Sequence, residues 1–330
     1  MPGKHRRANN ARRTVALLFA ALAWTAGAAE AQDRDVRHWL DRMALAVTNL
    51  DYRGSLVYAR GDALEAMQIF HRVREGQVEE RLVSMSGIHR EVLRNADGVR
   101  CIFPDRQSVV MDARIAEPWF PVIPSEQVAD PGTRYDFHLG NVERIAGMEA
   151  QVVEIVPKDQ FRYGFRLWLE VDTGMLLKSL HLDRNGRPIE QLMFTDLEIG
   201  AMISDADLRP SVREEGFLQV TFPKTPDAGP PEESRSWRVA RVPDGFTLRS
   251  HTQRGARAGE NLEHLVFTDG LASVSVYVEP MPSTGILEGA KELGSVNIFG
   301  AQVDGYAVTA LGAVPPATVR LMARSVRAVP

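Results

Sequence analysis

Between residues 52 and 112 the sequence repeats one pattern: a short segment in which apolar and polar residues alternate, followed by turn-forming residues. Each gap contains glycine, aspartate or proline, as in Gly61-Asp62 and Pro104-Asp105. Alternation with a period of two is typical of a β-strand with one buried face. Such strands, about ten residues apart and joined by short turns, predict an antiparallel meander.

The same alternation resumes near residue 135 and continues to about residue 199. Asp172-Thr173-Gly174 and Asn185-Gly186 are typical of hairpin turns, so neighbouring strands are again predicted to be antiparallel. Before the first strand, apolar residues from Val36 to Val47 follow a three-or-four spacing, which predicts a helix from Asp33 to about Asn49. Residues 116–132 contain four prolines and are predicted to cross between the two sets of strands, with a helical turn at 125–129.

A length of 330 residues exceeds what one core usually fills, so we expect two domains. Residues 222–236 contain four prolines and lack apolar periodicity, which is typical of a linker. The predicted fold class is α+β. A large curved antiparallel sheet, an unclosed barrel with helices, occupies residues 32–221, and a smaller α+β domain occupies residues 237–330. In the smaller domain we expect two strands around Pro243-Asp244-Gly245, a hairpin through Thr268-Asp269-Gly270, a short helix at 286–293 and a final helix begun by Pro315-Pro316.

Residues 1–31 have the features of a secretory signal peptide. Five Lys or Arg residues precede the apolar run Thr14–Trp24, and Ala29-Glu30-Ala31 forms a cleavage site before Gln32, with cleavage after Ala28 as the alternative. The apolar run is shorter than the roughly 18 residues of a spanning helix, which argues against a retained anchor. The arginine pair at 12–13 suggests twin-arginine export, but the residues around the pair fit that signal poorly, so ordinary export in unfolded form is expected. The mature protein is therefore expected in the periplasm.

Charge and cysteine content narrow the classes of partner. The full chain has 39 Lys and Arg against 43 Asp and Glu, and removal of residues 1–31 takes away five and one of these, leaving 34 against 42, or −8. An acidic exported protein is a poor candidate for nucleic-acid binding. Cys101 is the single cysteine, so no intramolecular disulfide can form, and no cysteine follows the signal segment to carry a lipid anchor. Its alternation with Val99 and Phe103 predicts a small buried residue rather than a reactive thiol.

No motif predicts an enzyme or a cofactor. The sequence lacks G-x-S-x-G, H-E-x-x-H, P-loop and G-x-G-x-x-G patterns, and its histidines are scattered singly over different strands. Glu170 and Asp172 are two residues apart and could form an acid pair at roughly 6.5–7 Å on one strand face. A working acid needs burial or a charged neighbour to raise its pKa, and Asp172 begins a turn. We therefore interpret the pair as residues on the solvent-exposed face of a hairpin.

The strands carry more large apolar side chains than one helix would cover. If the sheet curls into an incomplete barrel, its concave side becomes an apolar trough suited to acyl chains. The alternative is that these residues form the core beneath the N-terminal helix, and the pattern alone does not separate the two. The residues expected to line the trough are Leu56, Tyr58, Met67, Ile69, Leu82, Met85, Val110, Leu180 and Phe194.

Several longer strings support a resemblance to a known family. "YRGSLVYARGDALEAMQIFHRV", "LWLEVDTGMLLKS", "PIEQLMFTDL", "VPDGFTLRS", "LVFTDGLASVSVYVEP" and "YAVTALGAVPPATVRLMARSV" together resemble the RseB/MucB family of periplasmic stress-response regulators. The likeness runs from about residue 35 to 327. The strand and turn pattern of the first domain is also similar to that of the lipoprotein carriers LolA and LolB, which are half-open barrels.

The resemblance implies a function without catalysis. Such a protein binds the periplasmic domain of a membrane-spanning anti-sigma factor of the RseA/MucA type and protects it from regulated proteolysis. A lipid, lipoprotein or lipopolysaccharide effector entering the first domain would weaken that binding. Oligomeric state matters in this family, and the sequence leaves open whether this protein forms a homo-oligomer. The second domain and the cleft between the two domains are the expected partner contact. Arg249, Arg254 and Arg257 are candidate contact residues or, alternatively, part of a solvated loop. A lipoprotein carrier of the LolA type is the competing hypothesis.

Overall fold

The structure is a computed structural model that describes residues 35–112, 134–222, 236–254, 262–281 and 287–329. The predicted signal peptide, the predicted crossing segment at 116–132 and almost all of the predicted linker lie outside these ranges. Within them, the helices are too short or too polar to cross a bilayer.

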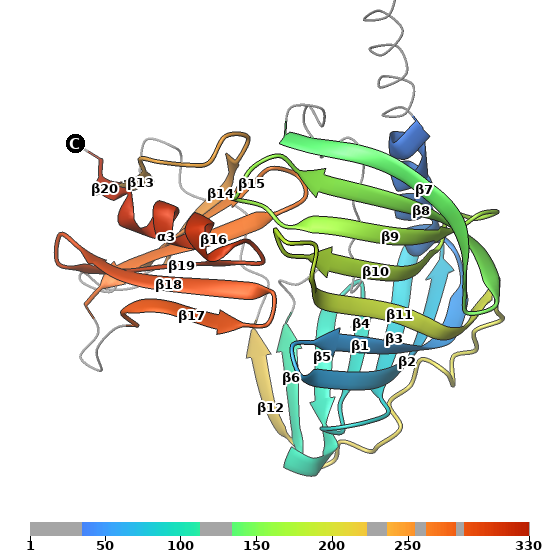
Figure 1. The fold of residues 1–330 in the computed structure, drawn as a ribbon. Helices are drawn as coiled ribbons and strands as arrows, with labels where there is room; N and C mark the ends of the chain where they lie inside the picture. The colour runs from blue at the N-terminus through green and yellow to red at the C-terminus, as the bar shows by residue number, and fades with distance from the viewer. Residues whose placement is uncertain (1–34, 113–133, 223–235, 255–261, 282–286, 330) are drawn as a thin grey trace, which may run out of the picture.

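Twelve strands form one large sheet (Figure 1). Their order is β12-β6-β5-β4-β3-β2-β1-β11-β10-β9-β8-β7. The strands are β1 (Tyr52–Arg60), β2 (Ala63–Arg74), β3 (Gln77–Ser84), β4 (Glu91–Asn95), β5 (Gly98–Phe103), β6 (Ser108–Asp112), β7 (Tyr135–Ile145), β8 (Met148–Pro157), β9 (Gly164–Glu170), β10 (Leu176–Leu182), β11 (Pro188–Ile199) and β12 (Leu218–Phe222), with a 3₁₀ turn, η1 (Pro104–Arg106), between β5 and β6.

The chain forms this sheet in two halves that meet at its centre. Strands β1 to β6 follow one another to one edge, and β7 to β11 return from the other edge until β11 pairs with β1. The predicted hairpin turns are present, with Gly174 and Gly186 at φ of 81° and 74°. The edge strands β7 and β12 do not pair with each other, so the curved sheet stays open. The prediction of a large unclosed antiparallel sheet is confirmed.

The N-terminal helix, residues 35–49, packs on the concave face of the sheet. Its stripe of Val36, Leu40 and Met43 is almost completely buried, in one cluster with residues from both halves of the sheet, such as Tyr52 and Leu167. The helix directly precedes β1 in the sequence, and the core of this domain forms around it. The helix therefore fills the part of the concave face that lies above the central strands.

Residues 201–217 cover part of the opposite, convex face. Ala201 and Ile203 pack on Phe70 of β2. The buried carboxylate of Glu91 pairs with Arg81 and accepts hydrogen bonds from Ser211. This segment closes the convex side of β2 to β5 before the chain reaches β12, which lies parallel to β6.

The smaller domain has a six-stranded antiparallel sheet in the order β14-β15-β16-β19-β18-β17 and a two-stranded sheet, β13-β20. One helix, α3 (Pro316–Arg324), packs on β16, β18 and β19 (Figure 1). Val319 and Met322 of α3 are buried against the sheet. The strands are β13 (Trp237–Val239), β14 (Thr247–Arg254), β15 (Leu262–Thr268), β16 (Ser273–Pro280), β17 (Gly289–Leu293), β18 (Val296–Val303), β19 (Tyr306–Gly312) and β20 (Val326–Ala328).

Four local predictions for this domain met different outcomes. The hairpin through Thr268-Asp269-Gly270 and the final helix after Pro315 are present. The predicted helix at 286–293 is wrong, because residues 289–293 form β17 and complete the sheet edge beside β18. The strands on either side of Pro243-Asp244-Gly245 do not pair with each other, since β13 pairs with β20 from the end of the chain. The molecule is richer in strands than a balanced α+β protein.

Candidate functional site

Most of the residues expected to line an apolar trough are part of the closed core. Leu56, Met67, Ile69, Leu82 and Phe194 are almost completely buried in the cluster that packs against the N-terminal helix. Side chains of this protein therefore occupy the space in which these five would contact a ligand. For them the alternative interpretation holds: they are core residues beneath the helix.

Two other expected trough residues lie elsewhere. Leu180 packs against the convex-face cluster that contains Trp168 and Leu177, not against the N-terminal helix. A β-bulge between Leu176 and Lys178 reverses which side the following residues face, and a pattern of strict alternation cannot reveal it. Met85 follows the last residue of β3 and is exposed to solvent. The assignment of both residues to the trough was wrong.

The concave face becomes accessible toward the β12 edge. One row of paired residues crosses the sheet from Ile69 through Leu82 and Val92, then through Cys101 and Val110 to Val220. The exposed fraction rises along this row, from 0% at Ile69 and 8% at Val92 to 38% at Val220, with Cys101 and Val110 half-buried. Burial also raises the pKa of the Cys101 thiol, as expected for a small apolar-facing residue.

Strand β12 extends this accessible area with two further apolar side chains. Leu218 and Phe222 lie on the same side of the strand as Val220, and both are exposed. We call Cys101, Val110, Leu218, Val220 and Phe222 the open end of the concave face. Tyr58, the remaining expected trough residue, lies away from it, half-buried and hydrogen-bonded to Glu190.

Glu170 and Asp172 do not form an acid pair. Glu170 is buried at the end of β9, which corrects the prediction that it is solvated, whereas Asp172 is exposed in the turn. Burial alone would raise the pKa of Glu170, but hydrogen bonds from Thr173 and the Asp172 backbone amide, together with the charge of Arg42, lower it. A carboxylate held ionised in this way closes a hairpin turn and cannot serve as a proton donor near neutral pH.

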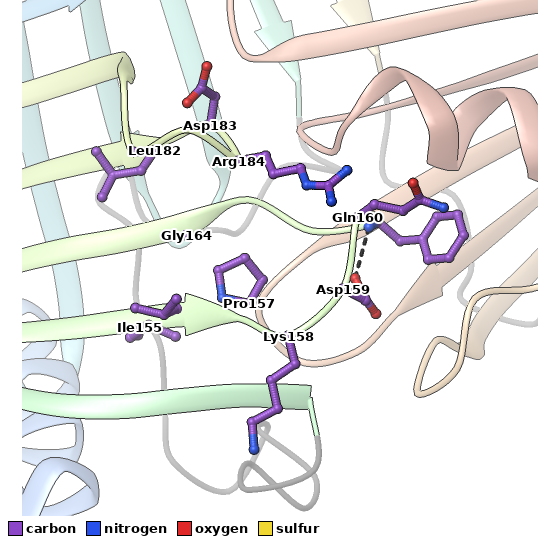
Figure 2. A pocket seen from close by; sticks show the side chains of 12 residues that line it. Ile155, Pro157, Lys158, Asp159, Gln160, Gly164, Leu182, Asp183 and Arg184 are labelled. Atoms are coloured by element: carbon purple, nitrogen blue, oxygen red, sulfur yellow. Dashed lines mark hydrogen bonds between the residues drawn. The ribbon is translucent and has the colours of Figure 1, made fainter.

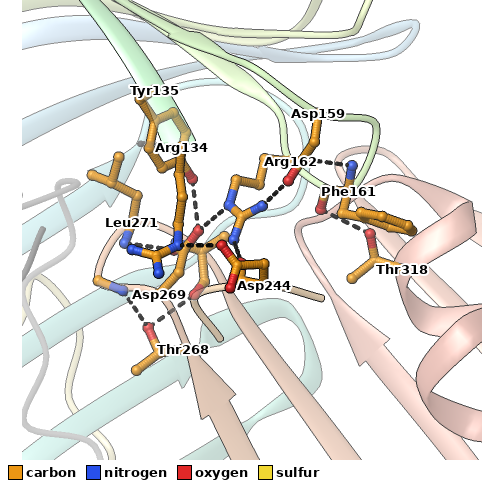
Figure 3. A network of polar contacts seen from close by, with 12 residues as sticks. Arg134, Tyr135, Asp159, Phe161, Arg162, Asp244, Thr268, Asp269, Leu271 and Thr318 are labelled. Carbon is orange, nitrogen blue, oxygen red and sulfur yellow. Dashed lines mark hydrogen bonds and ion pairs between the residues drawn. The ribbon is translucent and has the colours of Figure 1, made fainter. Parts of the chain in front are cut away.

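The two domains meet at a buried ion pair that the sequence did not indicate (Figure 3). Arg162, in the loop between β8 and β9, lies 2.5 Å from the carboxylate of Asp269 in the β15–β16 turn, and both side chains are fully buried. The hydroxyl of Tyr135 donates to the same carboxylate oxygen at 2.9 Å. Burial raises the pKa of Tyr135, and the negative charge of Asp269 adds to this effect, so the phenol stays protonated and donates.

The other carboxylate oxygen of Asp269 holds its own turn. It accepts hydrogen bonds from the backbone amides of Leu271 and Ala272. Leu271 in turn packs against the core cluster of the large domain. The carboxylate of Asp269 thus stabilises the β15–β16 turn with one oxygen and binds Arg162 of the large domain with the other.

The β8–β9 loop makes further contacts to the smaller domain. The guanidinium of Arg162 also donates to the backbone oxygen of Asp244, and the backbone oxygen of Phe161 accepts from Thr318 of α3 (Figure 3). The hydroxyl of Tyr163 accepts a hydrogen bond from buried Asn297 at 2.9 Å. These contacts reach three separate parts of the smaller domain, so this loop attaches that domain to the large sheet at several points.

A second polar contact between the domains centres on Glu190 of β11. Burial alone would raise its pKa, but contacts with His181, Ser295 and Tyr58 outweigh burial and lower the pKa to about 2. The nearest ring nitrogen of His181 is 3.9 Å from the carboxylate, so its effect is electrostatic rather than a hydrogen bond. Ser295 precedes β18, and Glu190 therefore binds the smaller domain as an ionised acceptor.

A cavity of about 590 Å³ adjoins the β8–β9 loop (Figure 2). Ile155, Gly164 and Leu182 contribute its apolar part, while Arg184 extends from the β10–β11 turn toward Gln160 of the loop. Any molecule in this cavity would contact the loop that holds the smaller domain. Among the described residues, no three His, Cys, Asp or Glu side chains are grouped closely enough to bind a metal ion.

The arginines proposed as partner contacts are only partly within the described structure. Arg249 is an exposed residue of β14, an edge strand of the smaller sheet. The backbone of Arg254 ends the same strand, and Arg257 lies outside the described residues. The described residues therefore do not test whether the three lie together, and their role in partner binding stays a prediction.

Comparison with known proteins identifies the family. The model of the MucB/RseB N-terminal domain matches residues 35–212, and the model of the MucB/RseB C-terminal domain matches residues 231–327. The chain belongs to the MucB/RseB family. Its relatives include the sigma factor AlgU regulatory protein MucB of Pseudomonas aeruginosa, which is 33% identical over 90% of this chain and 92% of that protein. The sigma-E factor regulatory protein RseB of Escherichia coli is 23% identical over 95% of both chains.

Solved structures of MucB share the fold. A crystal structure of MucB in complex with MucA(peri) matches with a TM-score of 0.68 and 30% identity, over 89% of this chain and 98% of that one. A crystal structure of MucB alone matches with a TM-score of 0.62 and 31% identity, over 90% and 98%. The MucB/RseB arrangement of two domains thus covers nearly all of the described chain.

Proposed function

We propose that this protein binds the periplasmic domain of a membrane-spanning anti-sigma factor of the MucA or RseA type, protects it from regulated proteolysis and so keeps the sigma factor inactive. The observation that carries the proposal is the match, over 98% of its length, to the MucB chain seen in complex with MucA(peri). The mature protein acts in the periplasm after removal of residues 1–31. Its role is binding rather than catalysis, in agreement with the regulatory names of its relatives.

The open end of the concave face is the proposed site of an acyl-chain effector. The core residues beneath the N-terminal helix are not accessible to a ligand, whereas Val220, Leu218 and Phe222 offer exposed apolar side chains next to half-buried Val110 and Cys101. An acyl chain lying along this row would bury apolar surface at roughly 25 cal/mol per Å². A lipid, a lipoprotein or lipopolysaccharide supplies such a chain.

The domain interface is the proposed route from effector to partner. An effector changes partner affinity only by the difference in its own affinity for two arrangements of the protein. The contacts of buried Arg162 and half-buried Glu190 define one arrangement of the two domains. In the proposal, the partner binds this arrangement and the effector binds better to one in which these contacts are rearranged. The effector then weakens partner binding, and the partner weakens effector binding to the same degree.

A protection assay tests the proposal. The purified mature protein is added to the periplasmic fragment of the anti-sigma factor and to the protease that initiates its cleavage. Protection that saturates with added protein, and that an acylated ligand relieves, is the expected result. Cleavage at an unchanged rate with saturating protein would contradict partner binding. Recovery of many different lipoproteins instead of an anti-sigma factor on capture from periplasm would favour a carrier.

A further inference from the structure

One surface of the smaller domain is strongly basic although the chain as a whole is acidic. Five arginines, Arg238, Arg241, Arg320, Arg324 and Arg327, are exposed and come from two segments far apart in the sequence. We call them the C-terminal arginine patch. Residues 237–243 and 313–329, which supply them, contain no aspartate or glutamate.

The pairing of β13 with β20 joins the two segments. Arg238 lies directly opposite Arg327 in this two-stranded sheet. The guanidinium of Arg327 donates to the backbone oxygen of Arg324 at 3.1 Å, which brings the end of α3 next to the sheet. The backbone amide of Arg241 donates to Ser325 at 3.0 Å and so places the first segment beside the same helix end.

The outward face of α3 continues the patch by one more helical turn. Arg320 and Arg324 are four residues apart, and both guanidinium groups lie over the ring of Phe299, at 5.7 and 5.2 Å from its centre. A guanidinium over an aromatic ring is held by cation–π attraction and keeps its hydrogen-bond donors free for another partner. The ring therefore orients two of the five charges without neutralising them.

No ion pair within the described residues involves any of the five arginines. Arg238 and Arg327 lie directly opposite each other on neighbouring strands, and like charges in this position are destabilising. Like charges four residues apart on a helix are destabilising too, as Arg320 and Arg324 are. An arrangement with these penalties, and with no counter-charge among the described residues, fits a surface whose negative charges come from outside the protein.

The composition of the patch distinguishes between kinds of anionic partner. Stable protein interfaces have apolar or aromatic anchors at their centre and a polar rim. Among the exposed large hydrophobic residues of the described chain, the patch has only Val329, at its border. Phospholipid headgroups need no apolar anchor, since each basic residue near an anionic membrane surface is attracted by the surface potential. The patch also lies on α3, β13 and β20, with β13 and β20 at the end of the molecule away from the large sheet (Figure 1).

We propose that the C-terminal arginine patch docks this protein on an anionic phospholipid surface. The acidic remainder of the chain is repelled by such a surface, so the patch also sets the orientation, with the smaller domain toward the lipid. Docking keeps the protein at the membrane from which the anti-sigma factor of the proposed function projects, and so raises the effective concentration for that partner. The docking itself needs neither that partner nor an acyl-chain effector.

Vesicle binding of the mature protein, without any partner, tests the proposal. The probes are vesicles of phosphatidylcholine alone and vesicles with about 30% phosphatidylglycerol, read by co-sedimentation. We expect binding to the anionic vesicles only, with loss of binding when salt is raised from about 0.1 M to about 1 M, because the screening length falls from about 10 Å to about 3 Å. The double variant Arg320→Gln, Arg324→Gln should bind about 30-fold more weakly, the equivalent of about 2 kcal/mol.

The matched control removes the same charge from the large domain. Arg144 and Arg187 are exposed there, and Arg144→Gln, Arg187→Gln should leave vesicle binding unchanged. A second patch variant, Arg238→Gln, Arg327→Gln, guards against a local effect on α3, and thermal unfolding checks that each variant folds. Equal binding by the patch and control variants, or binding that ignores lipid charge, would overturn the proposal. So would a patch variant that keeps vesicle binding but loses the periplasmic domain of the anti-sigma factor, which would make the patch a protein interface.

Discussion

Replacing Asp269 with asparagine tests how strongly the two domains are held together. The amide retains an oxygen for the backbone amides of Leu271 and Ala272, so the turn keeps its shape, but the charge opposite Arg162 is lost. Both side chains are fully buried, and removing one partner of a buried ion pair typically costs 3–5 kcal/mol. Arg162 keeps its contact with partly exposed Asp159, so we expect the lower end, about 3 kcal/mol.

Calorimetry and denaturant unfolding measure this loss. The expected result is that a single cooperative transition separates into two, because the smaller domain no longer unfolds together with the large sheet. Asp244→Asn is the control at the same interface: its side chain is 87% exposed and 3.3 Å from Arg134, so its loss should cost less than about 1 kcal/mol. Arg162→Met combined with Asp269→Leu should recover part of the stability, since no unpaired charge is left buried.

Equal effects of Asp269→Asn and Asp244→Asn would refute this reasoning. That outcome would mean that the buried pair contributes no more than an exposed one. The domains would then be held by apolar contacts such as that of Leu271, and the proposed coupling through Arg162 would fail.

Three further predictions concern Glu190, Glu170 and the open end of the concave face. Glu190 has a pKa lowered to about 2, so its contribution to the folded state is present above pH 4.5, its ordinary pKa, and is lost as the pH falls toward 2. Unfolding measured as a function of pH should show the free energy of unfolding fall by up to about 3 kcal/mol over this range, and Glu190→Gln should abolish that fall. Glu170→Gln should lower the free energy of unfolding by about 1–3 kcal/mol through lost hairpin hydrogen bonds, while Asp172→Asn, in the exposed turn, stays within about 0.5 kcal/mol. Val220→Asn with Leu218→Asn should weaken binding of a fluorescent acyl probe at least tenfold and leave the melting temperature unchanged, since both side chains are exposed; an unchanged probe affinity would place the effector elsewhere.

The features predicted correctly from the sequence are set by neighbouring residues. Alternation marked most strands of the two larger sheets, although not β17, and glycines such as Gly174 and Gly186 marked turns because they adopt positive φ. The stripe at Val36 and Leu40 indicated a helix with one buried face, which the structure places on the concave side of the sheet. Each of these signals is complete within a short stretch of chain.

The features that could not be predicted depend on distant parts of the chain. Alternation indicated that Leu56 and Phe194 are buried, but not whether a helix or a ligand covers them. A bulge of one residue moved Leu180 to the other face. Arg162 and Asp269 are 107 residues apart, and neither belongs to a motif, so their pairing follows only from the folded arrangement of the domains.

The most direct test of the account is a titration of the mature protein with the periplasmic domain of the anti-sigma factor, repeated in the presence of an acylated ligand. The account predicts saturable binding that the ligand weakens, together with a Val220→Asn variant that still binds the partner but no longer responds to the ligand. Absence of partner binding would contradict the assigned role. Partner binding that the ligand leaves unchanged would contradict the proposed release signal.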